Sequence, residues 1–321
     1  MSNSVVNPFW CVSANPAIDK RVRVSALTPG RVNRIREVHA EPGGKAAHVA
    51  MVLRALGAYP LWLGFAGGST GEQLLTGLQA LAIGTLPIRV NADTRVNLEI
   101  IDNQGDVTEL LEPGAQVAEH DWQSFFEACE NLLSDEKRSG TVIASGSLPP
   151  DADPAFYGKL TELAHRLGHK MFLDTGGESL RIALNAGPDF VKPNREEAED
   201  LLGATIGDCK SAAEAVHRFI QLGARSAVVS LGQEGFVWLA ASGGSTYWAR
   251  PASVKVTSSV GCGDATVAAF AYAMSAGFSV EHTLRLAAAC GAANCLAECP
   301  GRVRDTDVRA LEAKVSIKKL E

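Results

Sequence analysis

From residue 140 onward, short apolar runs alternate with longer amphipathic runs. Four of the apolar runs have the length and composition of buried strands, namely 141–145, 170–174, 190–192 and 227–231. Apolar residues at helical spacing predict helices over 153–167, 196–202 and 211–222. This strand–helix alternation predicts βαβ units and a parallel sheet, in which ligands bind beyond the carboxyl ends of the strands.

The first third of the chain carries a different pattern. Residues 20–24 and 31–40 contain many charges with valines interspersed, and residues 95–101 alternate strictly between polar and apolar side chains. The turn D-N-Q-G-D and residues 107–111 follow, which completes a β-hairpin with one polar face. We expect a small antiparallel sheet here that stands apart from the main domain as a lid over a cleft.

The size of the chain agrees with a large domain that carries such an appendage. The chain has 321 residues, of which 46% are apolar, so a full core can form. We predict a core made of residues 1–16, 41–86 and 114–321, and a lid made of residues 17–40 and 87–113.

Composition excludes several classes of protein. With 46% apolar and 21% charged residues, the chain is neither disordered nor fibrous. A net charge of −6 gives no basic field for nucleic acid or for an anionic membrane. No apolar run reaches the ~20 residues of a membrane helix, and the first residues do not resemble a signal peptide, so we expect a cytoplasmic protein.

The cysteines point to the same compartment. The chain has seven, without a C-x-x-C pair, which is typical of reduced thiols rather than of a disulfide framework. Cys290, Cys295 and Cys299 lie in and after an alanine-rich run. We expect a buried helix there, in which cysteine acts as a small hydrophobic residue.

The strongest chemical signal is Gly261-Cys262-Gly263-Asp264, which precedes an alanine-rich apolar run. Glycines before a helix leave its first amides uncovered, and these amides with the positive helix end form an anion hole. Asp264 would then be the base of a phosphoryl-transfer site. On this segment alone, a glycine turn followed by a capping Asp explains the pattern as well.

This segment resembles the second signature of the ribokinase-like (PfkB) carbohydrate kinase family. Other motifs of that family occur in the family's order along nearly the whole chain. They are Asn15-Pro16-Ala17-Ile18-Asp19, Gly43-Gly44-Lys45-Ala46-Ala47-His48-Val49-Ala50, Thr94-Arg95-Val96-Asn97, Gly146-Ser147-Leu148-Pro149-Pro150, Asp174-Thr175, Lys192-Pro193-Asn194 and Ser230-Leu231-Gly232-Gln233-Glu234-Gly235. Each motif is weak alone, but the ordered set is specific. The resemblance implies an α/β protein with a three-layer α/β/α fold, a mostly parallel central sheet and a small β-sheet lid.

The resemblance also implies roles for individual residues. Asp264 would accept the proton of the acceptor hydroxyl, and Gly261, Cys262 and Gly263 would donate amides to the transferred phosphoryl group. The sugar-binding set would be Asp19, Asn33, Gly43, Gly44, Lys45, His48, Arg95, Asn97 and Ser147, in which Arg95 and Ser147 reach a phosphate already on the sugar. From the residues alone, Asp19 could be a turn residue and Arg95 a solvated hairpin charge.

A nucleotide-binding set follows in the same way. It comprises Lys192, Asn194, Glu197, Ser230, Gly232, Gly235 and Asn294, of which Asn294 would face the adenine. Asn194 and Glu197 would organise Mg²⁺ indirectly, through water. The same two residues have the spacing of a capping box, and the two interpretations are compatible. No Walker A sequence is present, so the chain is not a P-loop kinase.

The chain departs from the family pattern at five positions, Ala46, His48, Glu99, Ser258 and Ser259. His48 stands where Asn is usual, and as a neutral imidazole it would offer one donor and one acceptor to the sugar. With a pKa near ~6.5, its protonation would then raise the sugar KM as the pH falls from about 7.5 to 6. Alternatively, His48 packs under the lid against a backbone carbonyl.

We therefore predict an ATP- and Mg²⁺-dependent kinase of the branch that acts on fructose 1-phosphate, tagatose 6-phosphate or fructose 6-phosphate. A monovalent cation and a homodimer formed through the lid are open options. The alternatives are a kinase for an unphosphorylated sugar or nucleoside, and a catalytically silent sugar-phosphate sensor. A dinucleotide-dependent dehydrogenase would need G-x-G-x-x-G after the first strand, where this chain has S-A-N-P-A-I-D.

Overall fold

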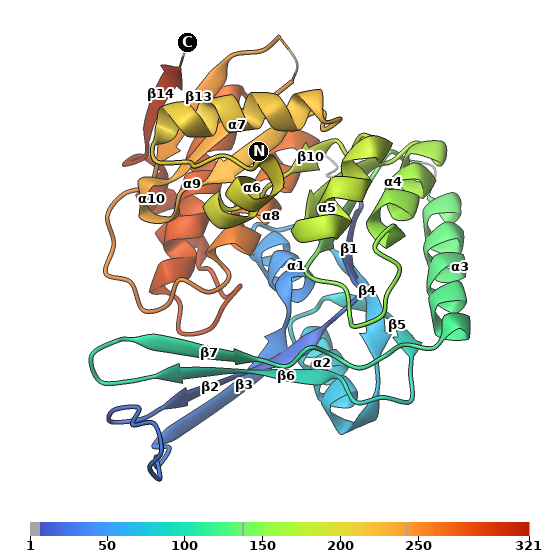
Figure 1. Cartoon of the computed structure of the whole chain (residues 1–321), viewed down its shortest axis with the longest axis vertical. Coiled ribbons are helices and arrows are strands. Elements are labelled where there is room, and N and C mark those ends of the chain that lie inside the picture. Colours follow the sequence, from blue (N-terminus) through green and yellow to red (C-terminus); the bar gives the residue numbers. More distant parts are fainter. Residues whose placement is uncertain (1–6, 137, 242, 321) are drawn as a thin grey trace.

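A ten-stranded sheet runs through the core of the computed structural model, which describes residues 7–136, 138–241 and 243–320 (Figure 1). The order across the sheet is β14-β13-β12-β11-β10-β9-β8-β1-β4-β5. Its strands are β1 (Phe9–Ser13), β4 (Leu61–Ala66), β5 (Gly84–Arg89), β8 (Thr141–Ser145), β9 (Lys170–Asp174), β10 (Phe190–Val191), β11 (Ala227–Ser230), β12 (Phe236–Leu239), β13 (Thr246–Arg250) and β14 (Ser316–Leu320).

The sheet is parallel from β5 to β11 and antiparallel from β11 to β14. The chain begins in the middle, at β1, then builds outward to β4 and β5 on one side and to β8 and its successors on the other. This reversal makes the β1–β8 boundary the switch point at which ligands bind in such sheets. The four strands predicted from the apolar runs are confirmed as β8, β9, β10 and β11.

Helices cover both faces of the sheet. One layer contains α1 (Lys45–Ala55), α2 (Gly68–Ala80), α8 (Cys262–Ser275), α9 (Val280–Leu296) and α10 (Asp305–Glu312), and its buried side chains form one apolar cluster with the sheet. The other contains α3 (Glu119–Asp135), α4 (Phe156–Arg166), α5 (Gly177–Ala183), α6 (Arg195–Leu202) and α7 (Cys209–Gln221), with a second cluster. The predicted three-layer α/β/α fold is therefore confirmed. None of the described helices is long and apolar enough to cross a membrane.

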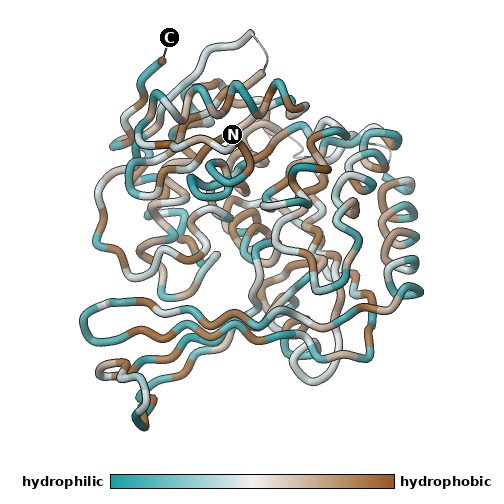
Figure 2. Tube along the Cα trace, in the orientation of Figure 1, coloured by the Kyte–Doolittle hydropathy of each residue, from teal (hydrophilic) through white to brown (hydrophobic). Residues whose placement is uncertain are grey.

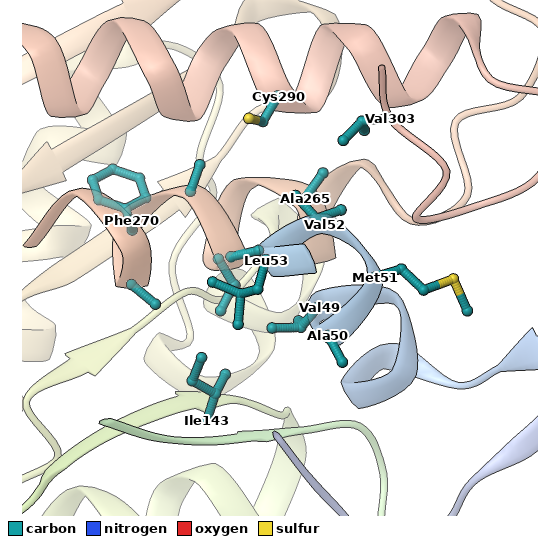
Figure 3. Close-up of a cluster of buried hydrophobic side chains, with 14 of the residues drawn as sticks. Val49, Ala50, Met51, Val52, Leu53, Ile143, Ala265, Phe270, Cys290 and Val303 are labelled. Atoms are coloured by element: carbon teal, nitrogen blue, oxygen red, sulfur yellow. The ribbon is translucent and has the colours of Figure 1, made fainter. Parts of the chain in front are cut away.

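Helix α1 is the centre of the first layer. Val49, Val52 and Leu53 are fully buried and lie with Ala265 of α8 and Ile143 of the sheet (Figure 3). Outer helices such as α3 and α7 instead alternate polar and apolar residues along their length (Figure 2). Packing of α1 against α8 fixes the relative position of their first turns, which carry the candidate site.

A second, four-stranded sheet projects from the core as the lid, in the order β3-β2-β6-β7 (Figure 1). Its strands are β2 (Ala17–Arg23), β3 (Glu37–Gly43), β6 (Arg95–Ile101) and β7 (Val107–Leu111). The predicted hairpin over 95–101 and 107–111 is confirmed residue for residue. The expected antiparallel sheet is wrong for the central pair, because β2 and β6 are parallel. They are not hairpin neighbours: the chain passes through the core between them and returns in the same direction.

The boundaries of the lid also differ from the prediction. The strand β5 pairs with β4 in the main sheet, so residues 87–89 belong to the core rather than to the lid. Conversely, the end of β3 up to Gly43 pairs with β2 in the lid. The apolar content of 84–89 suits an edge strand of the main sheet as well as a lid strand, and pairing with β4 decides between them.

Candidate active site

Polar residues gather at the carboxyl ends of the parallel strands. Asn15 follows β1, Asp174 ends β9, Lys192 follows β10 and Ser230 ends β11. Ser147 follows β8, and the Asn15 amide donates to its hydroxyl at 3.3 Å. The carboxyl ends of parallel strands share one edge of the sheet, so residues far apart in the sequence meet there. The first turns of α1 and α8 and the polar face of the lid complete the site.

The first turn of α8 carries the residues predicted for an anion hole. Gly261 is the N-cap with φ 81°, a left-handed conformation that favours glycine. A Cβ on Gly263 would lie 3.0 Å from Nζ of Lys192, so an ammonium group sits beside this turn. The Cys262 amide already donates to the Ser259 carbonyl at 3.3 Å. Asp264 is 5% exposed. Buried carboxylate, helix amides and ammonium thus converge on one point.

The first turn of α1 lies directly under the lid. Gly44 is its N-cap with φ 82°, and its amide donates to the Asp19 carboxylate. A Cβ on Gly43 would lie 2.3 Å from the carboxyl carbon of Asp19, so any side chain there would displace that group. The predicted set of Asp19, Gly43 and Gly44 is thus brought together at the junction of lid and core.

His48 lies between two carboxylates, with 3% of its surface exposed. Its Nδ1 is 2.8 Å from Oδ2 of Asp264. Its Nε2 is 2.8 Å from Oδ2 of Asp19, an ion pair whose direction is less favourable than that of a linear hydrogen bond. The Asn97 amide donates to the other oxygen of Asp19 at 2.9 Å. A continuous chain of contacts therefore joins the lid to α8 through α1.

The charge of His48 differs from the expectation. Burial alone would lower the pKa of His48, but its contacts with Asp19 and Asp264 outweigh this and raise the pKa to about 10. The ring is therefore an imidazolium at neutral pH and does not titrate between pH 7.5 and 6, so the expected rise of KM in that range is not supported. Burial would likewise raise the pKa of Asp19, but His48 and Asn97 hold it below its usual value.

Two lysines face one another across Asp174. The carboxylate of Asp174 is 1% exposed, with Nζ of Lys192 3.3 Å from Oδ1 and Nζ of Lys45 3.6 Å from Oδ2. Lys45 also lies 3.9 Å from Oε1 of Glu197. The nearby Asp174 charge raises the pKa of Lys45 against the effect of burial. Lys45 was expected among the sugar ligands, and the structure places its ammonium group among the predicted nucleotide ligands instead.

The other nucleotide candidates lie along the ends of β10 and β11. Asn194 and Glu197 form a capping box of α6, in which each side chain accepts the other's backbone amide at 2.8 Å. Ser230 forms a bridge with Asn194. Gly232 and Gly235 flank the short turn between β11 and β12, where a Cβ on Gly235 would lie 1.9 Å from the Ala249 carbonyl oxygen.

Two predicted ligands have other tasks. Asn294 is 2% exposed; its amide nitrogen donates to the Val260 carbonyl at 2.7 Å, and its oxygen accepts the Gly301 amide at 2.8 Å. It braces the turn before α8 through both of these contacts. Asn33 lies in the turn between β2 and β3, where it bonds to the backbone of Thr28 in both directions. The structure does not bring it to the other sugar-binding candidates.

Arg95 and Ser147 are brought together through Asn15. Arg95 donates to the carbonyls of Glu112 at 2.7 Å and of Asn15 at 3.1 Å. Its Nε is buried without a hydrogen-bond partner in the described part of the chain. Burial lowers the pKa of this guanidinium, although Asp19 opposes the effect. Arg95 therefore holds the lid to the core with one side of its guanidinium and leaves Nε unsatisfied.

Several notable residues were not singled out as site residues from the sequence. The sulfur atoms of Cys262 and Cys295 lie 3.1 Å apart, although we expected Cys295 only as a core residue. Cys299 follows the end of α9 and lines the pocket under the lid. Asp174 matched a family motif but was not named as a site residue. Its position at the end of a predicted strand could have identified it as one.

A pocket lies between the lid and the first turn of α1. It is lined by Asp19, Arg21, Glu41, His48, Glu99 and Pro300, among others. Arg21 and Glu99 form a buried ion pair in it, with Nη2 of Arg21 2.7 Å from Oε2 of Glu99. Because Glu99 is paired within the lid, it does not present a free charge to the pocket.

Comparisons with known proteins agree with this geometry. A model of the pfkB family of carbohydrate kinases matches residues 13–303. The 1-phosphofructokinase of Escherichia coli strain K12 is 34% identical over 306 residues, which cover 95% of each chain. That of Bacillus subtilis strain 168 is 30% identical over 290 residues, 90% of this chain and 93% of the relative. Phosphofructokinase-2 from Escherichia coli, solved with substrates and products, is 26% identical with a TM-score of 0.88, covering 96% of this chain and 99% of its own. The same enzyme has been solved with potassium.

A buried carboxylate, helix-start amides and two ammonium groups at the carboxyl edge of a parallel sheet define a phosphotransferase that acts on a small molecule. The chain belongs to the pfkB family of carbohydrate kinases. The predicted family, fold and enzyme class, a sugar-phosphate kinase, are therefore confirmed.

Proposed function

We propose that this enzyme transfers the γ-phosphoryl group of ATP to a hydroxyl of a phosphorylated ketohexose. One observation carries the proposal: Asp264 is buried in the first turn of α8, next to the amides of Gly261 and Gly263 and the Lys192 ammonium group. A carboxylate in that position can accept the proton of the acceptor hydroxyl. The amides and the ammonium group can stabilise the charge that develops on the transferred group.

The relatives support a choice among the substrates. Two of them are named 1-phosphofructokinases and a third is a phosphofructokinase-2. We therefore rank fructose 1-phosphate first, ahead of fructose 6-phosphate and tagatose 6-phosphate. The phosphate already on the sugar would bind at the end of the site formed by Arg95 and Ser147, because a charge-assisted contact to Nε would satisfy that buried group.

Each side chain in this proposal has its own task. Asp264 orients the acceptor hydroxyl and takes its proton, while Lys45 and Lys192 face the phosphates of the nucleotide. Asp174 keeps the two ammonium groups in place, because its buried carboxylate lies between them. The lid covers the sugar and excludes water from the reacting atoms. Positioning and electrostatic stabilisation supply most of the rate enhancement in such a reaction.

Magnesium fits this site through the nucleotide. Among the described residues, no group of three or more His, Cys, Asp or Glu side chains could hold a metal ion. Three cationic side chains face four carboxylates here: Lys45, His48 and Lys192, against Asp19, Asp174, Glu197 and Asp264. This set does not neutralise a triphosphate, so Mg²⁺ bound to ATP would supply the missing positive charge. We assign Glu197 to a water of that ion, and we allow for a monovalent cation as well.

The test is an assay of ATP consumption with fructose 1-phosphate, fructose 6-phosphate, tagatose 6-phosphate and free fructose. We expect turnover with at least one sugar phosphate and at most weak turnover with the free sugar, and loss of turnover when Mg²⁺ is chelated. Asp264→Asn should lower kcat by about 10²–10⁴ and leave the sugar KM nearly unchanged. Faster turnover of an unphosphorylated sugar or nucleoside would identify the alternative kinase. Sugar-phosphate binding without turnover would identify a silent sensor.

We also propose that a second copy of the chain covers the apolar face of the lid. Val38 and Leu110 are 50% and 55% exposed, and the pairing register puts both on the face opposite Asp19. Light scattering of the eluting protein should give twice the mass of one chain, and Leu110→Glu should return it to the monomer. A monomeric wild-type protein at micromolar concentration would rule out this dimer.

A further inference from the structure

His48 contacts two carboxylates, and only one of them, Asp19, belongs to the predicted sugar-binding set. Asp264 contacts Nδ1 through Oδ2, and Asp19 contacts Nε2 through its own Oδ2. All three residues are buried, with 3% to 8% of their surfaces exposed. The residue that the family pattern assigns to the sugar and the residue that it assigns to the base are therefore joined by one imidazole ring.

Both ring nitrogens must carry protons in this arrangement. A nitrogen lone pair 2.8 Å from a carboxylate oxygen would be repelled, whereas an N–H group is attracted. The ring therefore donates a hydrogen bond from Nδ1 to Asp264 and directs its Nε2 proton toward Asp19. It carries a positive charge between two negative charges. An Asn at this position carries no positive charge, so it could not form an ion pair with either carboxylate.

The carboxylate of Asp19 has other partners besides His48. Its carboxylate accepts the Gly44 amide and the Asn97 amide in addition to facing His48. Each oxygen of the Asp19 carboxylate therefore already has a partner, Asn97 for Oδ1 and His48 for Oδ2. In Asp264 only Oδ2 contacts the ring, so Oδ1 stays available for the acceptor hydroxyl.

We propose that His48 is a positioning residue for phosphoryl transfer: it holds the carboxylate of Asp264 through Nδ1 and is itself held by Asp19 through Nε2. The inference rests on the proposed function, since it gives Asp264 the role of base. In the step itself the hydroxyl O–H bond breaks, its proton moves to Oδ1 of Asp264, the oxygen–phosphorus bond forms and the bond to ADP breaks. His48 keeps both of its protons throughout. Asp19 thus acts on the base through His48.

The charged groups around His48 come from several elements. Asp19 approaches from β2 and Asp264 from α8, while Lys45 on the same helix points to Asp174 instead. On the pocket side, Glu41, Arg21 and Glu99 line the space next to the ring, and the last two are paired with each other. The carboxylates outnumber the free cations near the ring, which favours its charged form.

The test compares His48→Asn, Asp19→Asn and the double variant in a steady-state assay with the best sugar phosphate. We expect His48→Asn to lower kcat by about ten- to a hundred-fold while the sugar KM changes less than about three-fold, because the loss lies in the transition state. The double variant should be no slower than the slower single variant, because Asp19 acts through His48. A rise in KM with kcat retained would make His48 a sugar ligand, and additive losses of kcat would separate Asp19 from His48; either result overturns the proposal.

His165 offers a matched control. Its Nε2 lies 2.8 Å from Oδ2 of Asp189, the same contact at the same distance, far from the strand ends that carry the site. His165→Asn should leave kcat within about two-fold of the wild type. If it lowers kcat as much as His48→Asn does, the effect is a general loss of a His–Asp contact and the proposal fails.

A measurement on the wild-type protein keeps the proposal testable if His48→Asn does not fold. Among the seven histidines, one ring should remain protonated at pH 8.5 in NMR spectra of side-chain carbon and nitrogen. If the signal disappears in His165→Asn, it comes from the control ring and not from His48. Titration of every ring below pH 8 would overturn the proposal. If no sugar phosphate is phosphorylated, the proposed function fails, whereas the protonated ring still reports whether His48 bridges the two carboxylates.

Discussion

Replacement of Glu99 by Gln should destabilise the lid more than any change of an exposed charge there. Arg21 donates through Nε at 2.9 Å and through Nη2 at 2.7 Å to the same oxygen of Glu99, and the two side chains are 5% and 3% exposed. Removal of one partner leaves a buried charge uncompensated, which costs about 3–5 kcal/mol. At ~2.1 cal/mol/K per residue, unfolding of the 321-residue chain changes entropy by about 0.7 kcal/mol/K, so Tm should fall by about 4–7 °C.

The neighbouring pair of Arg23 and Glu37 gives the control. It lies on the same sheet with a 3.3 Å contact, but its side chains are 40% and 51% exposed. Glu37→Gln should therefore cost less than about 1 kcal/mol. Thermal unfolding measures the global effect, and amide hydrogen exchange in β2 and β6 measures the local one. The double variant Arg21→Met with Glu99→Leu should recover most of the loss, because no unpaired charge remains. Equal losses of stability in Glu99→Gln and Glu37→Gln would refute this reasoning. A double variant that is less stable than Glu99→Gln would refute it as well.

Other predictions concern binding, pH and oxidation. Arg95→Ala should raise the KM for a sugar phosphate at least about ten-fold and leave free-sugar turnover unchanged, since a charge-assisted contact is lost; equal losses would make Arg95 purely structural. The pKa of His48 rises from its ordinary 6.5 to about 10 on folding, so the ring stabilises the fold fully below pH 6.5 and progressively less up to pH 10. The free energy of unfolding should fall in that window by at most about 1.4 kcal/mol per pH unit, and His48→Asn should remove the slope in melts taken across it. Hydrogen peroxide should join the thiols of Cys262 and Cys295 in a disulfide with release of water, and should lower activity until a dithiol restores it; an equally sensitive Cys295→Ser variant would contradict this.

The sequence predicted the parts of the site that depend on local order along the chain. The ends of β8, β9 and β11 followed from apolar runs bounded by polar residues, and parallel pairing then brings Ser147, Asp174 and Ser230 to one edge. The turn before α8 followed from Gly261 and Gly263. Each of these features depends on residues that are close in the sequence, so the local sequence pattern is enough to predict it.

What the sequence did not predict depends on contacts between distant segments. His48 and Asp264 are separated by 216 positions, and only the packing of α1 on α8 brings them to 2.8 Å. The charge of His48 follows from its contacts with Asp19 and Asp264, so the ordinary pKa of ~6.5 placed its titration in a pH range that the structure does not support. Asn294 contacts the backbone of Val260 and Gly301, and no local pattern in the sequence indicates these contacts.

The two lid-side departures from the family pattern, His48 and Glu99, follow one physical rule. Both residues line the pocket under the lid, and each has a buried partner of opposite sign: Asp19 and Asp264 for His48, Arg21 for Glu99. A buried charge without a partner would cost several kcal/mol, so neither departure could be accommodated alone. His48 contacts only Oδ2 of Asp264, and the ion pair of Glu99 does not involve Arg95 or Ser147. Neither departure removes Asp264, Lys45, Lys192 or the glycines at the start of α8, so the chain keeps the groups that we propose for phosphoryl transfer, which favours an active kinase over a silent sensor.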